Sequence, residues 1–319
     1  MRPADEEQAE NIASASDTSK RRGTHMQIRL LGPIQLIEEN VPILLPGEKL
    51  RTIMAVLALT PGTPVLAVDL LDELWGDKLP KTAGNSLQSH VARLRRILAQ
   101  QTGKPSTRGL VRTSHSGYVL NVDPADVDAL WFTRAVDTAS RHMDADHELA
   151  VKLLTDAFAV WRGPALLDAG DGMICRIAYA RLEETRLIGR ELFIEAHLRL
   201  GRHQQVVPEL EQLLTQHPLR ERFCEQLMTA LYRSGRQADA ISAYRRVQHN
   251  LSTELGIDPG PGMQRKFREV LQQEENLLRG SSGGTAATAV PDTAAARAPA
   301  PSAVLSHGFG HPQDMPHSA

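Results

Sequence analysis

Helical periodicity constrains this chain more than any other feature of its sequence. After residue 127, apolar side chains recur three and four residues apart in seven consecutive segments that only short turns separate. Short turns place successive helices antiparallel, so this part of the chain is predicted to be all-helical. The segments run over Asp128 to Met143, His147 to Trp161, Ile174 to Leu200, His203 to His217, Arg220 to Arg233, Gln237 to Leu255 and Gly262 to Leu278.

An internal repeat indicates how these helices stack. Gly201-Arg202 and Gly235-Arg236 precede two of the helices and lie 34 residues apart, which is the tetratricopeptide period. The repeat rests on a single interval, because the final helix has no clear Gly-Arg pair at the next position. Helical repeats of this kind usually present a concave surface to proteins or peptides.

A different pattern precedes the helical part. Alternating residues predict strands at Met26 to Leu31, Ile34 to Ile37 and Val41 to Leu45. Three helices are then expected at Glu48 to Thr60, Ala67 to Trp75 and Thr82 to Leu98, and a hairpin at Leu110 to Val122. A sheet, three helices and a two-stranded hairpin are the layout of a winged helix.

These patterns divide the chain into four parts. We expect a disordered extension over residues 1–25, a winged-helix domain over 26–123, a helical domain over 124–279 and a disordered tail over 280–319. The predicted fold class is mainly α with a small α+β domain, in which a winged helix-turn-helix is followed by a tetratricopeptide-like helical repeat domain.

Composition excludes several function classes. Cys175 and Cys224 lie far apart without a CxxC pair, which argues against a disulfide framework and a zinc site and predicts ordinary buried thiols. No apolar run is long enough to span a bilayer, so we expect a cytoplasmic, nucleoid-associated protein without membrane contact. The sequence shows no phosphate-binding loop, metal motif or catalytic triad, so neither a cofactor nor catalytic residues are expected.

Charge is distributed unevenly along a chain whose formal net charge is −2. The stretch from Lys81 to Val122 contains seven Lys and Arg residues and not one Asp or Glu. In the third predicted helix, apolar residues form one face and leave a polar, cationic face with Thr82, Asn85, Ser89, Arg93 and Arg96. Arg can pair with guanine and Asn with adenine in the major groove, although an ordinary solvated helix face has the same pattern.

The acid-free hairpin next to that helix favours DNA. Arg112 and His115 lie near a tight turn, where Ser116 allows close approach to a minor groove or to the backbone. His90 and His115 have no carboxylate or thiol at metal-ligand spacing, so we expect them to contact DNA or solvent. Phosphate should repel the acidic side chains of the second helix, which are therefore expected to face away from DNA: Asp69, Asp72 and Glu73.

Two segments of the helical part are interpreted as ordinary connections. Residues 161–167 read as a helix terminus closed by Gly163-Pro164. The cluster Asp168 to Asp171 reads as a solvated loop, because its carboxylates lack the spacing of a metal site or an acid/base pair.

Several strings together resemble the Streptomyces antibiotic regulatory proteins, in which an OmpR-like winged helix precedes a bacterial transcriptional activation domain. The resemblance covers Met26 to Leu278, and the family commonly starts near Met26, so residues 1–25 depart from its pattern. It rests on residues 28–32 (IRLLG), 70–76 (LLDELWG), 87–96 (LQSHVARLRR), 116–118 (SGY), 231–236 (LYRSGR) and 254–261 (ELGIDPGP).

The resemblance implies a transcriptional activator of an antibiotic biosynthetic gene cluster. Such a protein binds direct repeats of double-stranded DNA near promoters as a homodimer and recruits RNA polymerase through its sigma factor. It also implies that Arg93 contacts a base, that Arg95 contacts a phosphate, and that a loop meets polymerase: Gly76, Asp77, Lys78, Leu79 and Pro80. With the residues that the pattern indicates, the predicted DNA-binding set is Lys81, Thr82, Asn85, Ser89, Arg93, Arg95, Arg96, Arg112, His115 and Ser116.

Two other classes of function remain open at this point. A helical-repeat scaffold whose winged helix binds protein would associate with DNA only weakly and without sequence preference. An enzyme would turn over a small molecule, for which no motif is present. The fold does not separate an activator from a repressor, because a reader over the promoter blocks polymerase whereas one upstream recruits it.

Overall fold

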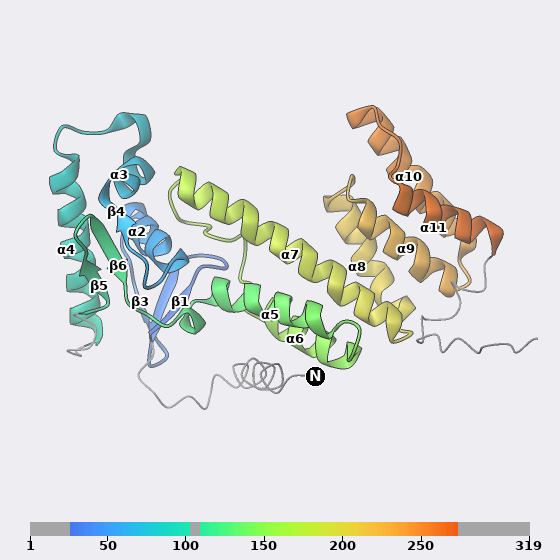
Figure 1. Ribbon diagram of the computed structural model, residues 1–319, viewed down its shortest axis with the longest axis horizontal. Coiled ribbons are helices and arrows are strands. Elements are labelled where there is room, and N and C mark those ends of the chain that lie inside the picture. The colour runs from blue at the N-terminus through green and yellow to red at the C-terminus, as the bar shows by residue number, and fades with distance from the viewer. Residues whose placement is uncertain (1–25, 103–108, 274–319) are drawn as a thin grey trace, which may run out of the picture. The chain divides into compact units, whose positions relative to one another are not determined.

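A small β-containing region precedes a helical region, as the sequence predicts (Figure 1). The computed structural model describes residues 26–102 and 109–273. The predicted disordered extension and tail lie outside the described residues. Within the described part, the fold class of mainly α with a small α+β region is confirmed.

The first sheet is a three-stranded antiparallel meander. It contains β1 (Met26–Arg29), β2 (Gln35–Glu38) and β3 (Val41–Ile43) in that order. Ile28 and Leu36 are partners in the β1–β2 register, and alternation places both on the buried face. Glu39 and Asn40 both have positive φ, which closes the β2–β3 hairpin with a two-residue turn.

Three helices and a second sheet complete the winged helix. The helices are α2 (Glu48–Leu59), α3 (Ala67–Trp75) and α4 (Ala83–Thr102), and a short 3-10 helix, η1 (Gly76–Lys78), follows α3. The second sheet has the order β4-β6-β5 and consists of β4 (Val65–Leu66), β5 (Val111–Thr113) and β6 (Gly117–Leu120). Strand β4 was not predicted, because two residues carry no periodicity.

The helical part begins after η3 (Pro124–Asp126). Its helices are α5 (Asp128–His142), α6 (His147–Ala159), α7 (Met173–Arg199), α8 (His203–Gln216), α9 (Glu221–Arg233), α10 (Gln237–Leu255) and α11 (Pro261–Gln272). Helix α11 ends at Gln272, and Gln273 adopts a left-handed conformation directly after it. Residues 274–278, over which the last helix was predicted to continue, lie outside the described residues.

The two Gly-Arg pairs form equivalent turns. Gly201 and Gly235 have φ 77° and 76°, a conformation that costs glycine little and terminates a helix. The N–H of Arg202 donates to the carbonyl of His197 at 2.9 Å, and the N–H of Arg236 donates to that of Leu231 at 2.9 Å. Both bonds span five residues, so the predicted repeat corresponds to a repeated helix termination.

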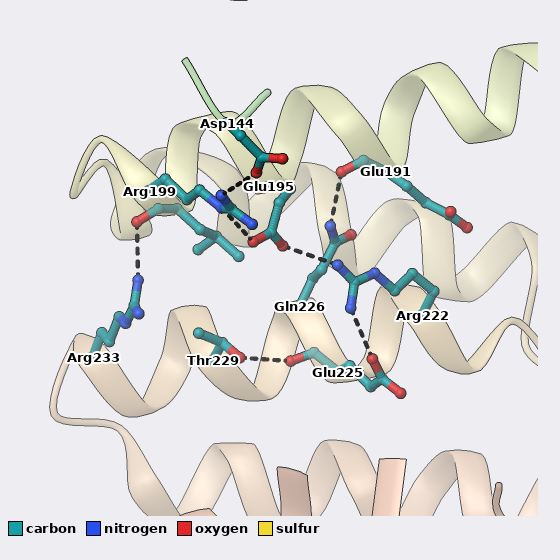
Figure 2. Close-up of polar contacts among 10 residues, drawn as sticks. Asp144, Glu191, Glu195, Arg199, Arg222, Glu225, Gln226, Thr229 and Arg233 are labelled. Carbon is teal, nitrogen blue, oxygen red and sulfur yellow. Dashed lines mark hydrogen bonds and ion pairs between the residues drawn. The ribbon is translucent and has the colours of Figure 1, made fainter. Parts of the chain in front are cut away.

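Polar contacts join α7 to α9 inside this repeat (Figure 2). Gln226 is buried, and its amide donates to the carbonyl oxygen of Glu191 at 2.8 Å. Arg222 pairs with Glu195 at 3.1 Å, and Arg199 pairs with the same carboxylate at 3.2 Å. These arginines are neutralised by acidic neighbours, unlike the cations of α4 described below.

The segment between α6 and α7 packs against the start of the chain. The N–H of Arg162 donates to the carbonyl of Leu31 at 2.9 Å, and the N–H of Leu166 donates to that of Leu30 at 2.8 Å. Asp128 accepts hydrogen bonds from the N–H groups of Leu30 and Leu31 at 2.6 and 3.2 Å. The interpretation of residues 161–167 as an ordinary helix terminus therefore missed a contact between distant parts of the chain.

Asp168 also contradicts its prediction as part of a solvated loop. Its carboxylate accepts a hydrogen bond from the N–H of Ile34 at 2.8 Å and pairs with the guanidinium of Arg51 at 3.0 Å. Gly170 donates to the hydroxyl of Thr52 on the same helix, α2, at 2.7 Å. This loop thus fastens the helical part to the winged helix.

Glu73 ties α3 to the first turn of α7. Its side chain is 6% exposed, and its carboxylate oxygens accept the N–H groups of Ile174 and Cys175 at 2.7 and 2.9 Å. The unpaired N–H groups at a helix N-terminus favour an anionic acceptor. Glu73 is therefore a buried partner of α7.

Candidate nucleic-acid interface

Helix α4 presents a polar, cationic face to solvent. Its apolar residues Leu87, Val91, Leu94 and Leu98 are buried against the winged-helix core. The same helical period leaves exposed the predicted DNA-facing residues Lys81, Thr82, Asn85, Ser89, Arg93 and Arg96. Within the described part of the chain, Arg93 and Arg96 form no ion pair. Their charges are therefore available to an external anion.

The start of α4 is fixed by local hydrogen bonds. The N–H of Ala83 donates to the carbonyl of Pro80, and the N–H of Ser86 donates to that of Thr82, both at 2.9 Å. The hydroxyl of Ser89 donates to the carbonyl of Asn85 at 2.9 Å. The hydroxyl oxygen of Ser89 can still accept a hydrogen bond, and its proton is engaged within the helix.

The β5–β6 hairpin, which we call the wing, stands next to α4. Arg112, His115 and Ser116 are exposed on it, as predicted. The carbonyl of Ser116 accepts the N–H of Ala67 at 2.9 Å, so the tip of the wing is joined to the first residue of α3. Arg112 donates through Nε to the carbonyl of Gly109 at 3.2 Å.

Gly117 allows the wing to lie close to β4. A Cβ atom at this position would be 1.9 Å from the carbonyl oxygen of Val65 and 2.9 Å from the Cα atom of Leu66. Residue 117 is paired with Leu66 in the β4–β6 register. The resemblance included this glycine within the string at residues 116–118, and the structure supplies the reason that no side chain fits there.

Arg95 differs from the other arginines of α4. Its side chain is half-buried and turned toward the wing, where Nε donates to the carbonyl of Val111 at 2.8 Å. The terminal nitrogen Nη2 donates to the hydroxyl of Thr113 at 2.9 Å. The guanidinium carbon also lies 5.9 Å from the ring centroid of Tyr118. The structure thus gives Arg95 partners inside the protein, which the expected phosphate contact did not anticipate.

His90 belongs to the packing between α4 and α3. Its ring centroid lies 6.1 Å from that of Trp75, and Lys49 covers the same indole with its Nζ atom 4.5 Å from the centroid. Burial, helped by the positive charges of Lys49 and Arg93, lowers the pKa of His90. The ring of His90 thus contacts Trp75 and, because the side chain is only half-buried, also remains accessible to solvent.

The predicted polymerase loop follows α3 directly. Gly76, Asp77, Lys78 and Leu79 are exposed, Pro80 is half-buried, and η1 forms the first part of the loop. Leu79 is 51% exposed although it is a large apolar residue. A single exposed leucine is ordinary on a protein surface and does not by itself mark a contact.

Other kinds of site find no support in the described residues. No group of three or more potential metal ligands occurs among them. No helix in the same residues is long and apolar enough to cross a membrane. Both cysteines are buried thiols, as predicted, and burial raises the pKa of Cys224 to about 12.

Comparison with known proteins assigns both halves of the chain. Residues 43–120 match the family model described as transcriptional regulatory protein, C terminal, and residues 127–271 match that of the bacterial transcriptional activator domain. The chain is 41% identical to the transcriptional regulator RedD of Streptomyces coelicolor, over 80% of this chain and 73% of that protein. It is 35% identical to the regulatory protein DnrI of Streptomyces peucetius, over 83% of this chain and 99% of that protein.

A solved structure agrees with these relatives. The structure of Mycobacterium tuberculosis EmbR, in complex with a low affinity phosphopeptide, superposes with a TM-score of 0.75 at 33% identity. The match covers 79% of this chain and 66% of that one. From its two family matches and these relatives, the chain belongs to the Streptomyces antibiotic regulatory proteins, a family of transcriptional regulators rather than enzymes.

Proposed function

We propose that the protein is a sequence-specific DNA-binding activator of an antibiotic biosynthetic gene cluster. It binds direct repeats near promoters as a homodimer and recruits RNA polymerase through the sigma factor. The observation that carries this proposal is the exposed face of α4 beside the exposed wing, in a stretch with seven cations and no acid. Clustered cations on one face are the electrostatic footprint of a DNA-binding surface.

The proposed contacts divide by their chemistry. Arg93 and Asn85 on the outer face of α4 read base edges in the major groove, with Ser89 and Arg96 beside them. Lys81 and Thr82 at the start of α4 hold the phosphate backbone, and the wing follows the adjacent groove with Arg112, His115 and Ser116. The loop at residues 76–80 extends from α3 toward the sigma factor.

Selection of bound DNA from a random library tests the proposal. The full chain is incubated with the library at near-physiological salt, and the bound molecules are amplified and sequenced. Two copies of one motif at a fixed spacing would support a dimeric reader of direct repeats. Binding without any motif would favour the alternative of a helical-repeat scaffold with only non-specific DNA affinity.

Replacing Arg93 with alanine is expected to weaken specific binding by about 1–3 kcal/mol, as for loss of one bidentate guanine contact. Preference should relax at one base position, while affinity for unrelated DNA falls much less. Titration of the selected site and its single-base variants measures both effects. Arg176→Ala, which removes an exposed arginine from α7, is the matched control. An unchanged base profile in Arg93→Ala would remove this residue from the reading set.

Replacing Leu79 with alanine is expected to reduce transcriptional activation without weakening DNA binding. The side chain projects from the polymerase loop without contributing to the core, so DNA affinity and stability should stay within about 0.5 kcal/mol of wild type. Transcription in vitro from a promoter with an upstream operator should fall several-fold. Full activation by this variant would show that Leu79 makes no contact on which activation depends. Repression from the same template would identify a repressor.

A further inference from the structure

We infer that Arg95 is a positioning residue that sets the wing relative to α4, and that it acts on specificity through the wing. The inference rests on the proposed function, because it concerns how the DNA-reading surface is built. The sequence places Arg95 between Arg93 and Arg96, and the resemblance assigned it to a phosphate. Its contacts in the structure point to a different role.

The position of Arg95 on the helix turns it away from the outer face. Successive residues of an α-helix are rotated by about 100°, so neighbours of an outward arginine lie at its sides. Arg93 and Arg96 are exposed, whereas Arg95 is half-buried between α4 and the wing. Although these three arginines are close together in sequence, Arg93 and Arg96 face solvent whereas Arg95 faces the wing.

The guanidinium of Arg95 uses three features of the wing at once. It donates to the backbone of Val111, to the side chain of Thr113 on the same strand, and lies near the ring of Tyr118 on the next strand. A planar fork with fixed donor directions suits this arrangement, and the point charge of lysine does not reproduce it. These contacts therefore fix both the orientation of the wing relative to α4 and its distance from α4.

The opposite side of the wing is held by backbone contacts. Strand β6 pairs with β4, and the carbonyl of Ser116 accepts the N–H of Ala67. Arg95 adds hydrogen bonds from α4 to β5, so the hairpin is held in place by α4 on one side and by β4 and the start of α3 on the other. The spacing between Arg93 and the exposed residues His115 and Ser116 depends on both ties. If α4 reads one groove, this spacing decides where the wing meets the DNA.

Lysine and alanine variants separate positioning from phosphate binding. A phosphate contact tolerates lysine, which binds phosphate as a point charge, so Arg95→Lys would keep wild-type affinity. A positioning role requires the fork, so Arg95→Lys and Arg95→Ala should both lose about tenfold in specific affinity, as expected for two lost hydrogen bonds. Arg96→Lys and Arg96→Ala are the matched controls on the exposed face.

Thr113→Val tests the same tie from its other end. The substitution removes the hydroxyl that accepts from Arg95, keeps a β-branched residue in the strand, and alters no cation. We expect it to weaken specific binding several-fold and to add little further loss to Arg95→Ala. A phosphate role for Arg95 predicts no effect of Thr113→Val and independent, additive losses in the double variant.

Selection with wild type, Arg95→Lys and Thr113→Val supplies a readout of specificity. The positioning role predicts that bases read by α4 are retained in both variants, while preferences on the wing side of each half-site are lost. Thermal unfolding checks that the variants are folded. A wild-type motif that Arg95→Lys preserves in full, at unchanged affinity, would overturn the inference and leave the proposed function intact. Absence of any wild-type motif would instead overturn the proposed function.

Discussion

Replacing Glu73 with glutamine is expected to lower the free energy of unfolding by about 2–4 kcal/mol. The buried carboxylate accepts hydrogen bonds from two N–H groups at the start of α7, and at 6% exposure it has little access to solvent. Glutamine keeps the shape but offers a neutral oxygen, and its NH2 group is placed against an N–H donor. One buried donor is then left without an acceptor, and the favourable charge at the helix N-terminus is lost.

Chemical denaturation of the full chain measures this effect. Asp72→Asn is the matched control, because it removes an exposed carboxylate from the same helix and should change stability by about 0.5 kcal/mol or less. Equal losses from the two variants would show that Glu73 contributes only through the net charge of α3.

Gly172 offers a second approach to the same contact. A Cβ atom there would lie 2.2 Å from Cδ of Glu73 and 2.4–2.5 Å from both of its carboxylate oxygens. Gly172→Ala should therefore push the carboxylate away from α7 and cause a comparable loss, without changing any charge. Combined with Glu73→Gln, it should add much less than its separate effect, because both changes break one contact.

Replacing Gly117 with alanine is expected to be the most damaging single change in the wing. The added Cβ would overlap the backbone of β4, which cannot rotate aside as a side chain can. Relief requires that β6 separate from β4, at a cost of about 1–3 kcal/mol or more, as for overpacked sites. The tip of the wing would move with β6, so specific DNA affinity should fall together with stability.

Hydrogen exchange and DNA titration check this prediction together. The amides of β6 and the N–H of Ala67, which is bonded to Ser116, should exchange faster in Gly117→Ala. Gly109→Ala is the control, since among the described residues a Cβ atom there would meet only the guanidinium of Arg112, at 3.8 Å or more. Normal protection of β6 in Gly117→Ala would mean that the strands accommodate a methyl group without separating.

Sequence periodicity predicts those features that short stretches of the chain determine by themselves. The outer face of α4 follows from Leu87, Val91, Leu94 and Leu98, which repeat within one helix. Its limits, like those of the other helices before α11, lie within a few residues of the prediction. The wing could also be predicted from the sequence, because alternating residues and a Ser-Gly turn mark the hairpin locally.

Contacts between segments that are distant in sequence could not be predicted from local periodicity. Glu73 lies 101 residues from Ile174, and Asp168 lies 134 residues from Ile34, so no local period relates either pair. One signal was available, since Glu73 falls between Leu70 and Leu74 in the buried stripe of α3. An acid within an apolar stripe requires a partner. The wing contacts of Arg95 depend likewise on tertiary structure, which its place in the sequence does not reveal.

The pairing of residues 162–166 with Leu30 and Leu31 affects how regulators of this kind can be recombined. A chimera joined near residue 123 would take β1 from one parent and its backbone partners, together with Asp128, from the other. The larger core crosses the same junction, with Ile28 and Phe132 in one cluster. An exchange of DNA readers should therefore transplant α5, α6 and the segment up to Cys175 together with the winged helix, and rejoin the parents after the first turn of α7.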